Sequence, residues 1–452
     1  MVASRIFGTD GVRGVANREL TPELAFRIGR AAAGIVAGVS ERNRPIIVGR
    51  DTRLSGTMLE AALVAGIAST GRDALTVGVV PTPGVAHLTV AGGAAAGVMI
   101  SASHNPIEDN GIKIFGADGF KLDDAREAEI ERAVADDSAL PRPTHTAVGI
   151  VRTAHELVDG YVTALVAQGG DLSSLTLVVD CAFGAAYEVG PAALARLGAK
   201  VEPLHAQDDG TRINVACGST DLRTLGEHVR AFSAAQPTAR VFGVAFDGDA
   251  DRALFVDEAG EVKTGDHVML ILGREKKQRG ALACDTVVGT VMSNVGLERA
   301  LQAEGIALAR APVGDRYVLE RLRASGATFG GEQSGHIIDL MHNTTGDGPA
   351  TAIALASLIA RERTTLRELS AALHVAPQIL VNVRTARRNV LDHDEVRAAI
   401  VHAEVELGRG GRILVRASGT EPLVRVMIEG DDRRKIETLA YGVAEIIERA
   451  AQ

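Results

Sequence analysis

Short apolar runs alternate with amphipathic stretches along most of this chain. Residues 45–49 form an apolar run that ends in a polar loop, residues 58–69 carry Leu and Ala at helical spacing, and residues 74–80 form a second apolar run. This alternation predicts strands and helices in turn, which is typical of α/β domains whose helices cover a mainly parallel sheet. Residues 96–100 are predicted as a further strand, and the polar segment 101–106 follows it directly. Ligand-binding loops in such folds follow the carboxyl ends of strands, so this segment is a candidate site.

The same alternation begins again twice further along the chain. Strands are predicted at 175–180, 200–204 and 286–292, and helices at 189–197 and 295–304. The pattern therefore predicts three successive α/β domains.

The pattern changes after about residue 372. Strands are predicted at 381–385, 412–416 and 424–429, and helices at 394–406 and 432–452. This mixture suits a small α+β domain at the C-terminal end of the sequence.

Four domains are therefore expected, and the length of 452 residues agrees with that number, since domains typically contain about 100–200 residues. A helix predicted at 153–168 is expected to bridge the first two. The predicted domains are 1–152, 153–254, 255–371 and 372–452.

Composition excludes several classes of protein. The hydrophobic fraction of 46% and the charged fraction of 23% are ordinary for a globular protein and argue against disorder. The formal charge of −9 argues against the strongly basic surface that nucleic-acid-binding proteins use. No segment resembles a signal peptide or reaches the ~20 apolar residues of a membrane helix, so a cytoplasmic protein without a membrane partner is expected. Three widely spaced cysteines are expected to be reduced thiols, namely Cys181, Cys217 and Cys284.

The segment Ser101–Pro106 presents Ser103 after an apolar strand, where a ligand can reach its hydroxyl. His104 follows it, and Lys113 returns an ammonium group close by in sequence. Taken alone, the segment is better explained as a turn, because Ser and Asn are common turn residues. The G-x-S-x-G motif of many serine hydrolases is absent around Ser103.

Three carboxylates alternate on the loop 247–252. Asp247, Asp249 and Asp251 would repel one another strongly without a cation, and such oxygen ligands favour Mg²⁺ or Ca²⁺. With Glu258 they match positions of a Ca²⁺-binding EF-hand loop, but Arg252 stands where that loop needs Gly. The flanking residues also favour strands over helices, so a metal loop between strands is the better prediction.

Two further polar loops are candidates for substrate binding. Glu332 and Ser334 alternate between two glycines and are able to point the same way toward sugar hydroxyls, although a turn or a helix cap explains them about equally well. In the loop 416–422, a guanidinium, two hydroxyls and the backbone around a glycine form a candidate anion nest, to which Arg425 is able to add a second guanidinium. The residues of this nest are Arg416, Ser418, Gly419 and Thr420.

Together these loops resemble the α-D-phosphohexomutase superfamily. The resemblance extends over nearly the whole chain, from residues 7–14 to 416–430, and all four loops occur in the family order. At position 333 the chain carries Gln, which is similar to the subgroup that acts on glucosamine phosphates. Relatives that act on glucose or mannose phosphates commonly carry Met there. The resemblance implies three related mixed-sheet α/β domains plus a smaller α+β C-terminal domain around a central cleft.

The resemblance also implies a reaction. Ser103 would be carried as phosphoserine and would give its phosphoryl group to a hexosamine phosphate, with glucosamine 1,6-bisphosphate as the intermediate. The substrates would be glucosamine 6-phosphate and glucosamine 1-phosphate, feeding UDP-N-acetylglucosamine synthesis. Glucosamine 1,6-bisphosphate or glucose 1,6-bisphosphate is an expected activator, and a separate phosphorylation would first activate Ser103. A homodimer is one expected assembly, although no residue pattern defines it.

The resemblance assigns roles to the candidate residues. One Mg²⁺ would be held by the phosphate on Ser103 and by Asp247, Asp249 and Asp251. The catalytic set would be Ser103, His104, Lys113, Arg13 and His336, with Lys113 and Arg13 assisting proton transfer and charge near Ser103 and His336 serving as acid or base on the sugar side. The substrate contacts would be Glu332, Ser334, Arg416, Ser418, Gly419, Thr420 and Arg425.

Three rival functions follow from the same residues. A phosphoglucomutase or phosphomannomutase shares the chemistry and differs in the sugar. A Ca²⁺ or sugar-phosphate sensor would bind without turnover. A metal-dependent phosphatase would use an Asp nucleophile and release inorganic phosphate.

Overall fold

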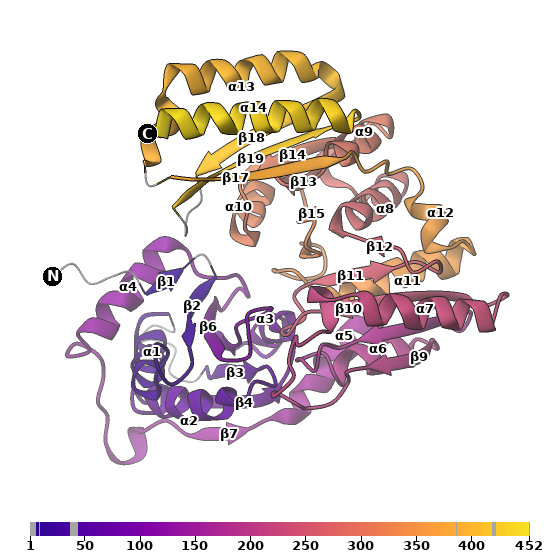
Figure 1. Ribbon diagram of the computed structural model, residues 1–452. Helices are drawn as coiled ribbons and strands as arrows, with labels where there is room; N and C mark the ends of the chain where they lie inside the picture. Colours follow the sequence, from indigo (N-terminus) through magenta and orange to yellow (C-terminus); the bar gives the residue numbers. More distant parts are fainter. Residues whose placement is uncertain (1–5, 9, 37–43, 386, 418–421, 452) are drawn as a thin grey trace.

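Four β-sheets with their helices follow one another along the chain (Figure 1). The computed structural model describes residues 6–8, 10–36, 44–385, 387–417 and 422–451. Three α/β units and a smaller C-terminal unit confirm the expected fold class. Among the described residues, no helix combines the length and apolar character needed to cross a membrane.

The first sheet is mixed. Its order is β1-β2-β6-β5-β3-β4-β7, and β5, β3, β4 and β7 run parallel while β6 and β2 are antiparallel to their neighbours. The strands are β1 (Phe7–Gly8), β2 (Gly11–Val15), β3 (Ile46–Arg50), β4 (Ala74–Val79), β5 (Ala96–Ile100), β6 (Asp109–Gly116) and β7 (Val151–Thr153). The helices are α1 (Pro22–Ile35), α2 (Ser55–Ala68), α3 (Thr82–Ala91) and α4 (Asp124–Ala135).

The second sheet has the order β12-β11-β10-β8-β9. Its strands are β8 (Leu175–Asp180), β9 (Lys200–Leu204), β10 (Arg240–Phe246), β11 (Ala253–Val256) and β12 (Val262–Lys263), and its helices are α5 (Val158–Gln168), α6 (Val189–Arg196) and α7 (Arg223–Ala235).

Two details in this region differ from the sequence prediction. The helix predicted from residue 153 begins at Val158, because Thr153 still pairs with β4. β11 and β12 pair with the second sheet, although residues from 255 onward were predicted in the third domain. The exact domain boundaries remain a prediction.

The third sheet has the order β14-β13-β15-β16. Its strands are β13 (Thr286–Thr290), β14 (Ala307–Ala311), β15 (Phe329–Gly331) and β16 (Ile337–Asp339). The helices are α8 (Gly265–Gln278), α9 (Val295–Ala303), α10 (Asp315–Ser325), α11 (Gly348–Glu362) and α12 (Leu366–Ser370). The strand predicted to residue 292 ends at Thr290, where a turn leads into α9.

The fourth sheet is antiparallel, in the order β17-β19-β18. Its strands are β17 (Gln378–Arg384), β18 (Gly411–Ala417) and β19 (Leu423–Gly430). The helices α13 (Asp394–Leu407) and α14 (Arg433–Ala451) cover one face of it (Figure 1). On α14, Ile436, Ala440, Val443 and Ile447 recur at helical spacing and are buried against that face.

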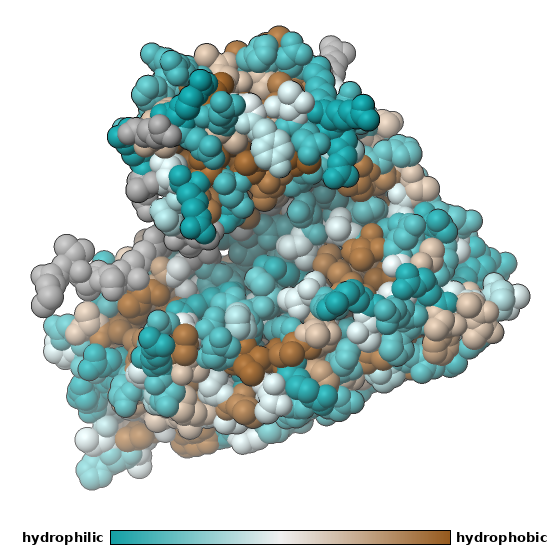
Figure 2. All heavy atoms as spheres, viewed as in Figure 1, coloured by the Kyte–Doolittle hydropathy of each residue, from teal (hydrophilic) through white to brown (hydrophobic). Residues whose placement is uncertain are grey.

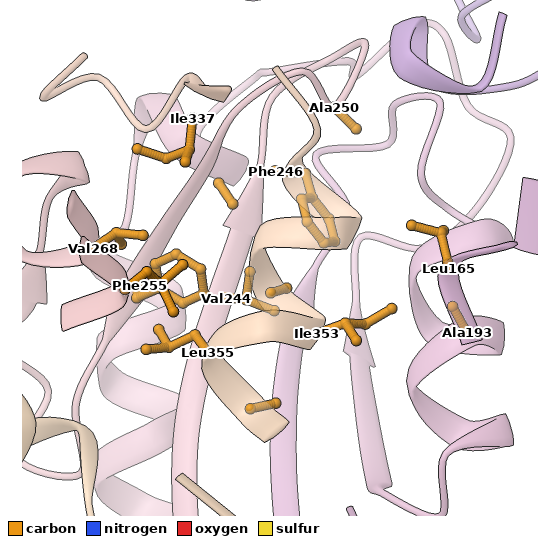
Figure 3. Close-up of a cluster of buried hydrophobic side chains, with 14 of the residues drawn as sticks. Leu165, Ala193, Val244, Phe246, Ala250, Phe255, Val268, Ile337, Ile353 and Leu355 are labelled. Atoms are coloured by element: carbon orange, nitrogen blue, oxygen red, sulfur yellow. The ribbon is translucent and has the colours of Figure 1, made fainter. Parts of the chain in front are cut away.

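One hydrophobic core joins the first three sheets, whereas the fourth has its own. Figure 3 shows the part of the shared core beside the second sheet, where Phe246 on β10 lies among side chains of the surrounding elements. Leu165 of α5, Val268 of α8 and Ile353 of α11 belong to the same cluster. This packing fixes the loops that follow β5, β10 and β15 relative to one another.

Candidate active site

Ser103 lies in the loop between β5 and β6 and is almost fully buried, with 1% of its surface exposed. Its Oγ donates a hydrogen bond of 2.5 Å to Asp247 Oδ2 in the loop after β10. The Nδ1 atom of His104 lies 3.2 Å from the same Oγ. The structure therefore brings the candidate nucleophile loop and the candidate metal loop into direct contact.

Asp247, Asp249 and Asp251 converge in that contact. One carboxylate oxygen of each lies within 4.8 Å of the others, and all three residues are buried. Asp249 Oδ1 and Asp251 Oδ1 have no hydrogen-bond partner among the described residues. Buried anionic oxygens without partners are costly unless a cation neutralises them. This donor set therefore fits a hard divalent cation.

Lys113, on β6, is the main fixed cation beside these carboxylates. Its Nζ lies 2.8 Å from Asp249 Oδ2, 3.1 Å from Asp10 Oδ2 and 3.5 Å from Asp251 Oδ2. Burial acts to lower the pKa of Lys113, but the three carboxylates outweigh it and hold the pKa well above its ordinary value. The ammonium group is therefore a permanent positive charge in the site.

The carboxylates around Lys113 differ in their proton affinity. Burial acts to raise the pKa of Asp249, but the ammonium of Lys113 and the hydrogen bonds from Lys113 and Thr82 outweigh it and hold the pKa below its usual range. For Asp247, burial and the neighbouring charges of Asp251 and Asp249 raise the pKa well above 3.8. The protein therefore compensates the charge of Asp247 less than that of Asp249.

A glycine allows the two loops to approach so closely. A Cβ atom at Gly248 would lie 2.5 Å from the carbonyl oxygen of Ser103. Such a contact forces the backbone apart, so a side chain at this position would separate the hydroxyl of Ser103 from Asp247.

The loop between β15 and β16 supplies the next group of side chains. Glu332 Oε2 lies 3.5 Å from Ser334 Oγ, which agrees with the expectation that the two side chains point the same way. His336 Nε2 lies 3.7 Å from Asp315 Oδ2 and 3.9 Å from Asp251 Oδ2, and neither ring nitrogen has a hydrogen-bond partner among the described residues. Backbone pairing between Arg252 and His336 joins this loop to the metal loop.

These loops surround a cavity of about 440 Å³. Arg13 and His104 line it from the first domain, Asp251 from the second, and Glu332 and His336 from the third. Figure 2 shows the molecule hollowed between the C-terminal lobe and the body below it, with hydrophilic residues along the hollow. A volume of this size is in the range of sites for small molecules.

The two predicted phosphate-binding arginines that the structure describes do not line this cavity. Arg416 on β18 and Arg425 on β19 face each other across the antiparallel ladder of the fourth sheet, and neither lines the cavity. Ser418, Gly419 and Thr420 lie outside the described residues. The structure thus places the two arginines opposite each other on neighbouring strands of the C-terminal domain.

Four residues without a predicted role complete the site. Lys121 Nζ lies 2.5 Å from Asp10 Oδ1 and also pairs with Asp315, so it links the first domain to the third. Asp10 pairs in addition with Arg13, and Thr82 Oγ1 donates a hydrogen bond of 2.6 Å to Asp249 Oδ2. Asp10 and Asp315 lie in polar segments noticeable in the sequence, whereas nothing around Thr82 or Lys121 marks them as site residues.

Family models match each of the four domains. Those for the alpha/beta/alpha domains I, II and III of phosphoglucomutase/phosphomannomutase match residues 4–140, 159–260 and 264–375, and the model for its C-terminal domain matches residues 380–446.

Curated relatives and solved structures agree with these models. A phosphoglucosamine mutase from Moorella thermoacetica is 51% identical over 98% of this chain and 99% of its own length, and one from Pelotomaculum thermopropionicum is 53% identical over 98% of each chain. A crystal structure of a phosphoglucomutase/phosphomannomutase family protein from Burkholderia thailandensis shares the fold, with a TM-score of 0.84, 24% identity and coverage of 100% of this chain and 98% of that one. The chain therefore belongs to the phosphoglucomutase/phosphomannomutase family and, within it, to the phosphoglucosamine mutases.

Proposed function

We propose that this protein interconverts glucosamine 6-phosphate and glucosamine 1-phosphate through a phosphoserine at residue 103. The product would feed UDP-N-acetylglucosamine synthesis. The observation that carries the proposal is the hydrogen bond of 2.5 Å between Ser103 Oγ and Asp247 Oδ2, within a set of three buried carboxylates. A hydroxyl in this position is next to the charges that a phosphoryl group needs neutralised.

The carboxylate cluster supports a bound Mg²⁺. The residues that would hold it are Asp247, Asp249 and Asp251, together with the phosphate on Ser103. When bound, the ion would neutralise charge on the phosphate oxygens. Lys113, whose pKa is held above its ordinary value, supplies a second positive charge in the same place. We assign Lys113 a role in charge neutralisation, since an ammonium that does not lose its proton is a poor base.

The reaction proceeds in two phosphoryl transfers. In the first, the bond between phosphorus and Ser103 Oγ breaks, and a bond forms between phosphorus and the free hydroxyl of the sugar phosphate. The hydroxyl proton passes to the base on the sugar side, for which His336 is proposed, and the Ser103 oxygen takes up a proton from water. The resulting glucosamine 1,6-bisphosphate then turns round, and Ser103 accepts the other phosphoryl group by the reverse of the first step. Positioning and charge supply most of the rate in such transfers.

The cavity provides groups for the sugar. We propose that Glu332 and Ser334 bind its hydroxyls, since their side chains lie 3.5 Å apart on one loop and Glu332 lines the cavity. His336, whose ring nitrogens have no hydrogen-bond partner among the described residues, is proposed as the acid or base on the sugar side. Arg13 and His104 line the same cavity, and His104 Nδ1 lies 3.2 Å from Ser103 Oγ.

The C-terminal domain is proposed to hold the phosphate that does not react. Arg416 and Arg425 are register partners on β18 and β19, and their guanidinium groups suit bidentate contacts with phosphate. The predicted partners Ser418, Gly419 and Thr420 remain part of this proposal. A single clamp for the distant phosphate would allow the substrate to bind in both orientations.

One experiment tests the proposal directly. The protein is mixed with glucosamine 6-phosphate, Mg²⁺ and a trace of a hexose bisphosphate, and phosphorus NMR follows the appearance of the 1-phosphate beside a parallel sample with glucose 1-phosphate. The intact mass of the protein is recorded at the same time. We expect turnover of glucosamine phosphate and an added mass of ~80 Da for one phosphoryl group. Preference for glucose phosphate would indicate the sister activity, and binding without turnover would indicate a sensor.

A further inference from the structure

The backbone at Ser103 adopts a conformation that residues with a side chain seldom adopt. Its φ angle is +53°, in the left-handed region. A residue persists there only when its surroundings hold it in place. The amide of Ser103 donates a hydrogen bond of 2.9 Å to Ser101 Oγ, and its carbonyl oxygen accepts two, from Arg53 Nη2 and Asn214 Nδ2, each at 2.9 Å.

Arg53 secures this loop from within the first domain. Its guanidinium is buried, and Nε donates to Asp51 Oδ2 at 3.1 Å. The two terminal nitrogens donate to four backbone carbonyl groups of the loop, those of Ser103, Asn105, Pro106 and Asp109. Arg53 thereby ties the whole loop between β5 and β6 to the carboxyl end of β3.

Asn214 reaches Ser103 from the second domain, and its own backbone is fixed in turn. It has a φ of +59°, and its amide donates a hydrogen bond of 3.0 Å to the carbonyl of Ala182. Asp180 accepts hydrogen bonds from the amides of Ala182 at 2.9 Å and Gly218 at 3.0 Å. Several neighbours on the same two loops share the left-handed conformation, namely Ala182, Phe183, His205 and Ala216.

Asp180 also belongs to a second group of possible metal ligands, with His205 and Cys217. Both of its carboxylate oxygens already accept hydrogen bonds from backbone amides, and His205 Nδ1 lies 3.0 Å from Oδ1. Through these contacts, Asp180 holds the loop that carries Asn214 in place, which accounts for the three residues lying together without a metal ion.

Asn214 lies where the nucleophile loop meets the metal loop. A Cβ atom built at Gly248 would lie 2.5 Å from the carbonyl oxygen of Ser103 and 2.8 Å from Asn214 Nδ2. Three loops from two domains therefore converge on one carbonyl oxygen. Among the described residues, the carbonyl oxygen of Ser103 accepts a hydrogen bond from one donor in the second domain, the side-chain amide of Asn214.

We propose that Asn214 and Arg53 are positioning residues for phosphoryl transfer at Ser103. Through their hydrogen bonds to the Ser103 carbonyl, they hold the backbone of this residue in the left-handed conformation and so direct Oγ toward Asp247. Asn214 acts through the backbone of Ser103, since its side-chain amide donates to the carbonyl oxygen of that residue and not to Oγ. The inference rests on the proposed function, because it concerns the same serine. Small displacements of a reacting atom reduce transfer rates by up to about 100-fold.

The test compares Asn214→Ala and Asn214→Asp with wild type and with Thr70→Val. Asn214→Asp retains the shape of the side chain but removes the amide donor. Thr70→Val is a matched control, because it removes another buried side-chain donor to a carbonyl, that of Ile67 at 2.7 Å, away from the described site. Each protein is phosphorylated to the same extent, as judged by intact mass, and assayed for kcat, KM, melting temperature and the single-turnover loss of its phosphate to glucosamine 6-phosphate.

We expect both Asn214 variants to lose about 10- to 100-fold in kcat and in the single-turnover rate. KM for the sugar phosphate and the Mg²⁺ requirement should stay unchanged, and melting temperature should fall no further than in Thr70→Val. The control should retain wild-type kcat. Arg53→Lys should show the same fall in kcat as Asn214→Ala if it folds, but the Asn214 variants decide the question.

Three results would overturn the inference in different ways. If wild type interconverts the two phosphates and Asn214→Ala or Asn214→Asp keeps its kcat, the positioning role is wrong while the proposed function stands. A loss confined to KM or to melting temperature would overturn the role as well. If wild type itself fails to interconvert them, the proposed function is wrong, and the inference falls with it.

Discussion

Ser103 Oγ and Asp247 Oδ2 lie 2.5 Å apart, although the two residues are 144 positions apart in the sequence. Ser103 follows β5 of the first sheet, and Asp247 follows β10 of the second. Burial and two neighbouring carboxylates raise the pKa of Asp247, so an added positive charge would be stabilised at this point. The contact joins the proposed nucleophile to the proposed metal site.

The first prediction concerns Ser103 itself. Ser103→Ala should abolish the interconversion of glucosamine phosphates, because no hydroxyl remains to carry the phosphoryl group. The variant should fold, since alanine removes one buried oxygen atom and adds no volume. Phosphorus NMR measures turnover, and intact mass should show that the added ~80 Da is absent. Turnover near that of wild type would rule out the mechanism.

Asp249 should control the response to Mg²⁺. Asp249→Asn removes one anionic oxygen of the proposed Mg²⁺ site and leaves Lys113 without its nearest carboxylate partner, which lies at 2.8 Å. The concentration of Mg²⁺ needed for half-maximal activity should therefore rise about tenfold or more. A titration after removal of metal with a chelator measures it. The control is Asp159→Asn, which changes an exposed carboxylate paired with Arg196, and its Mg²⁺ titration should match that of wild type. If the Mg²⁺ titration of Asp249→Asn also matched wild type, Asp249 would be excluded as a ligand.

Lys121 should matter for stability, because it bridges two domains. Its ammonium pairs with Asp10 and Asp315, and all three side chains are mostly buried, with 16–20% of their surface exposed. Lys121→Met should destabilise the protein by about 2–4 kcal/mol, since two largely buried carboxylates lose a partner. Urea denaturation provides the measurement.

The comparison for Lys121 is a lysine on the surface. Lys200 pairs with Glu202 at 3.4 Å, and 55% of its side chain is exposed. Lys200→Met should cost less than about 1 kcal/mol, because exposed ion pairs contribute little. Equal losses in the two variants would show that the bridge between Asp10 and Asp315 contributes no more than a surface pair.

Asp266 should make stability depend on pH. Burial is the main reason that its pKa rises from 3.8 to about 6. A carboxyl group with a raised pKa in the folded state favours folding most when protonated, so its contribution is present below pH 3.8 and is lost as pH rises through about 6. The full loss corresponds to about 3 kcal/mol.

Asp266→Asn isolates this effect. Asparagine keeps an oxygen that accepts the hydrogen bond from the Asn294 amide, which is 2.8 Å long, but does not titrate. Measured by denaturation between pH 5 and pH 7.5, the variant should gain stability relative to wild type as pH rises. A constant difference across that range would contradict the raised pKa.

Gln333 should influence the choice of sugar. Its backbone carbonyl accepts a hydrogen bond of 3.0 Å from the amide of Gly265, and the residue is half-buried. Gln333→Met should shift the ratio of kcat/KM toward glucose 1-phosphate by about tenfold, since a lost polar contact penalises the amino sugar. Parallel assays on the two sugar phosphates give the ratio, and an unchanged ratio would remove Gln333 from the specificity determinants.

Local pattern was sufficient for most elements of the fold. Short, continuous apolar runs predicted β3, β5, β8 and β10, because buried strands of parallel sheets are apolar along their whole length. The helix predicted from residue 153 began too early, because Thr153 completes a sheet through pairing with β4, a distant contact that no local pattern encodes.

The sequence by itself determined the chemical character of each loop. Ser103 after a strand, three alternating carboxylates, and Glu332 with Ser334 between glycines were all recognisable, because polar residues that interrupt apolar runs are conspicuous in a linear pattern. Only the tertiary structure decided which of these residues meet. The pairing of Lys121 with Asp10 and Asp315, and the hydrogen bond from Asn214 to the Ser103 carbonyl, join residues more than 100 positions apart. Such contacts arise when separate sheets pack on a shared core, so they depend on the whole fold and leave no local signal in the chain.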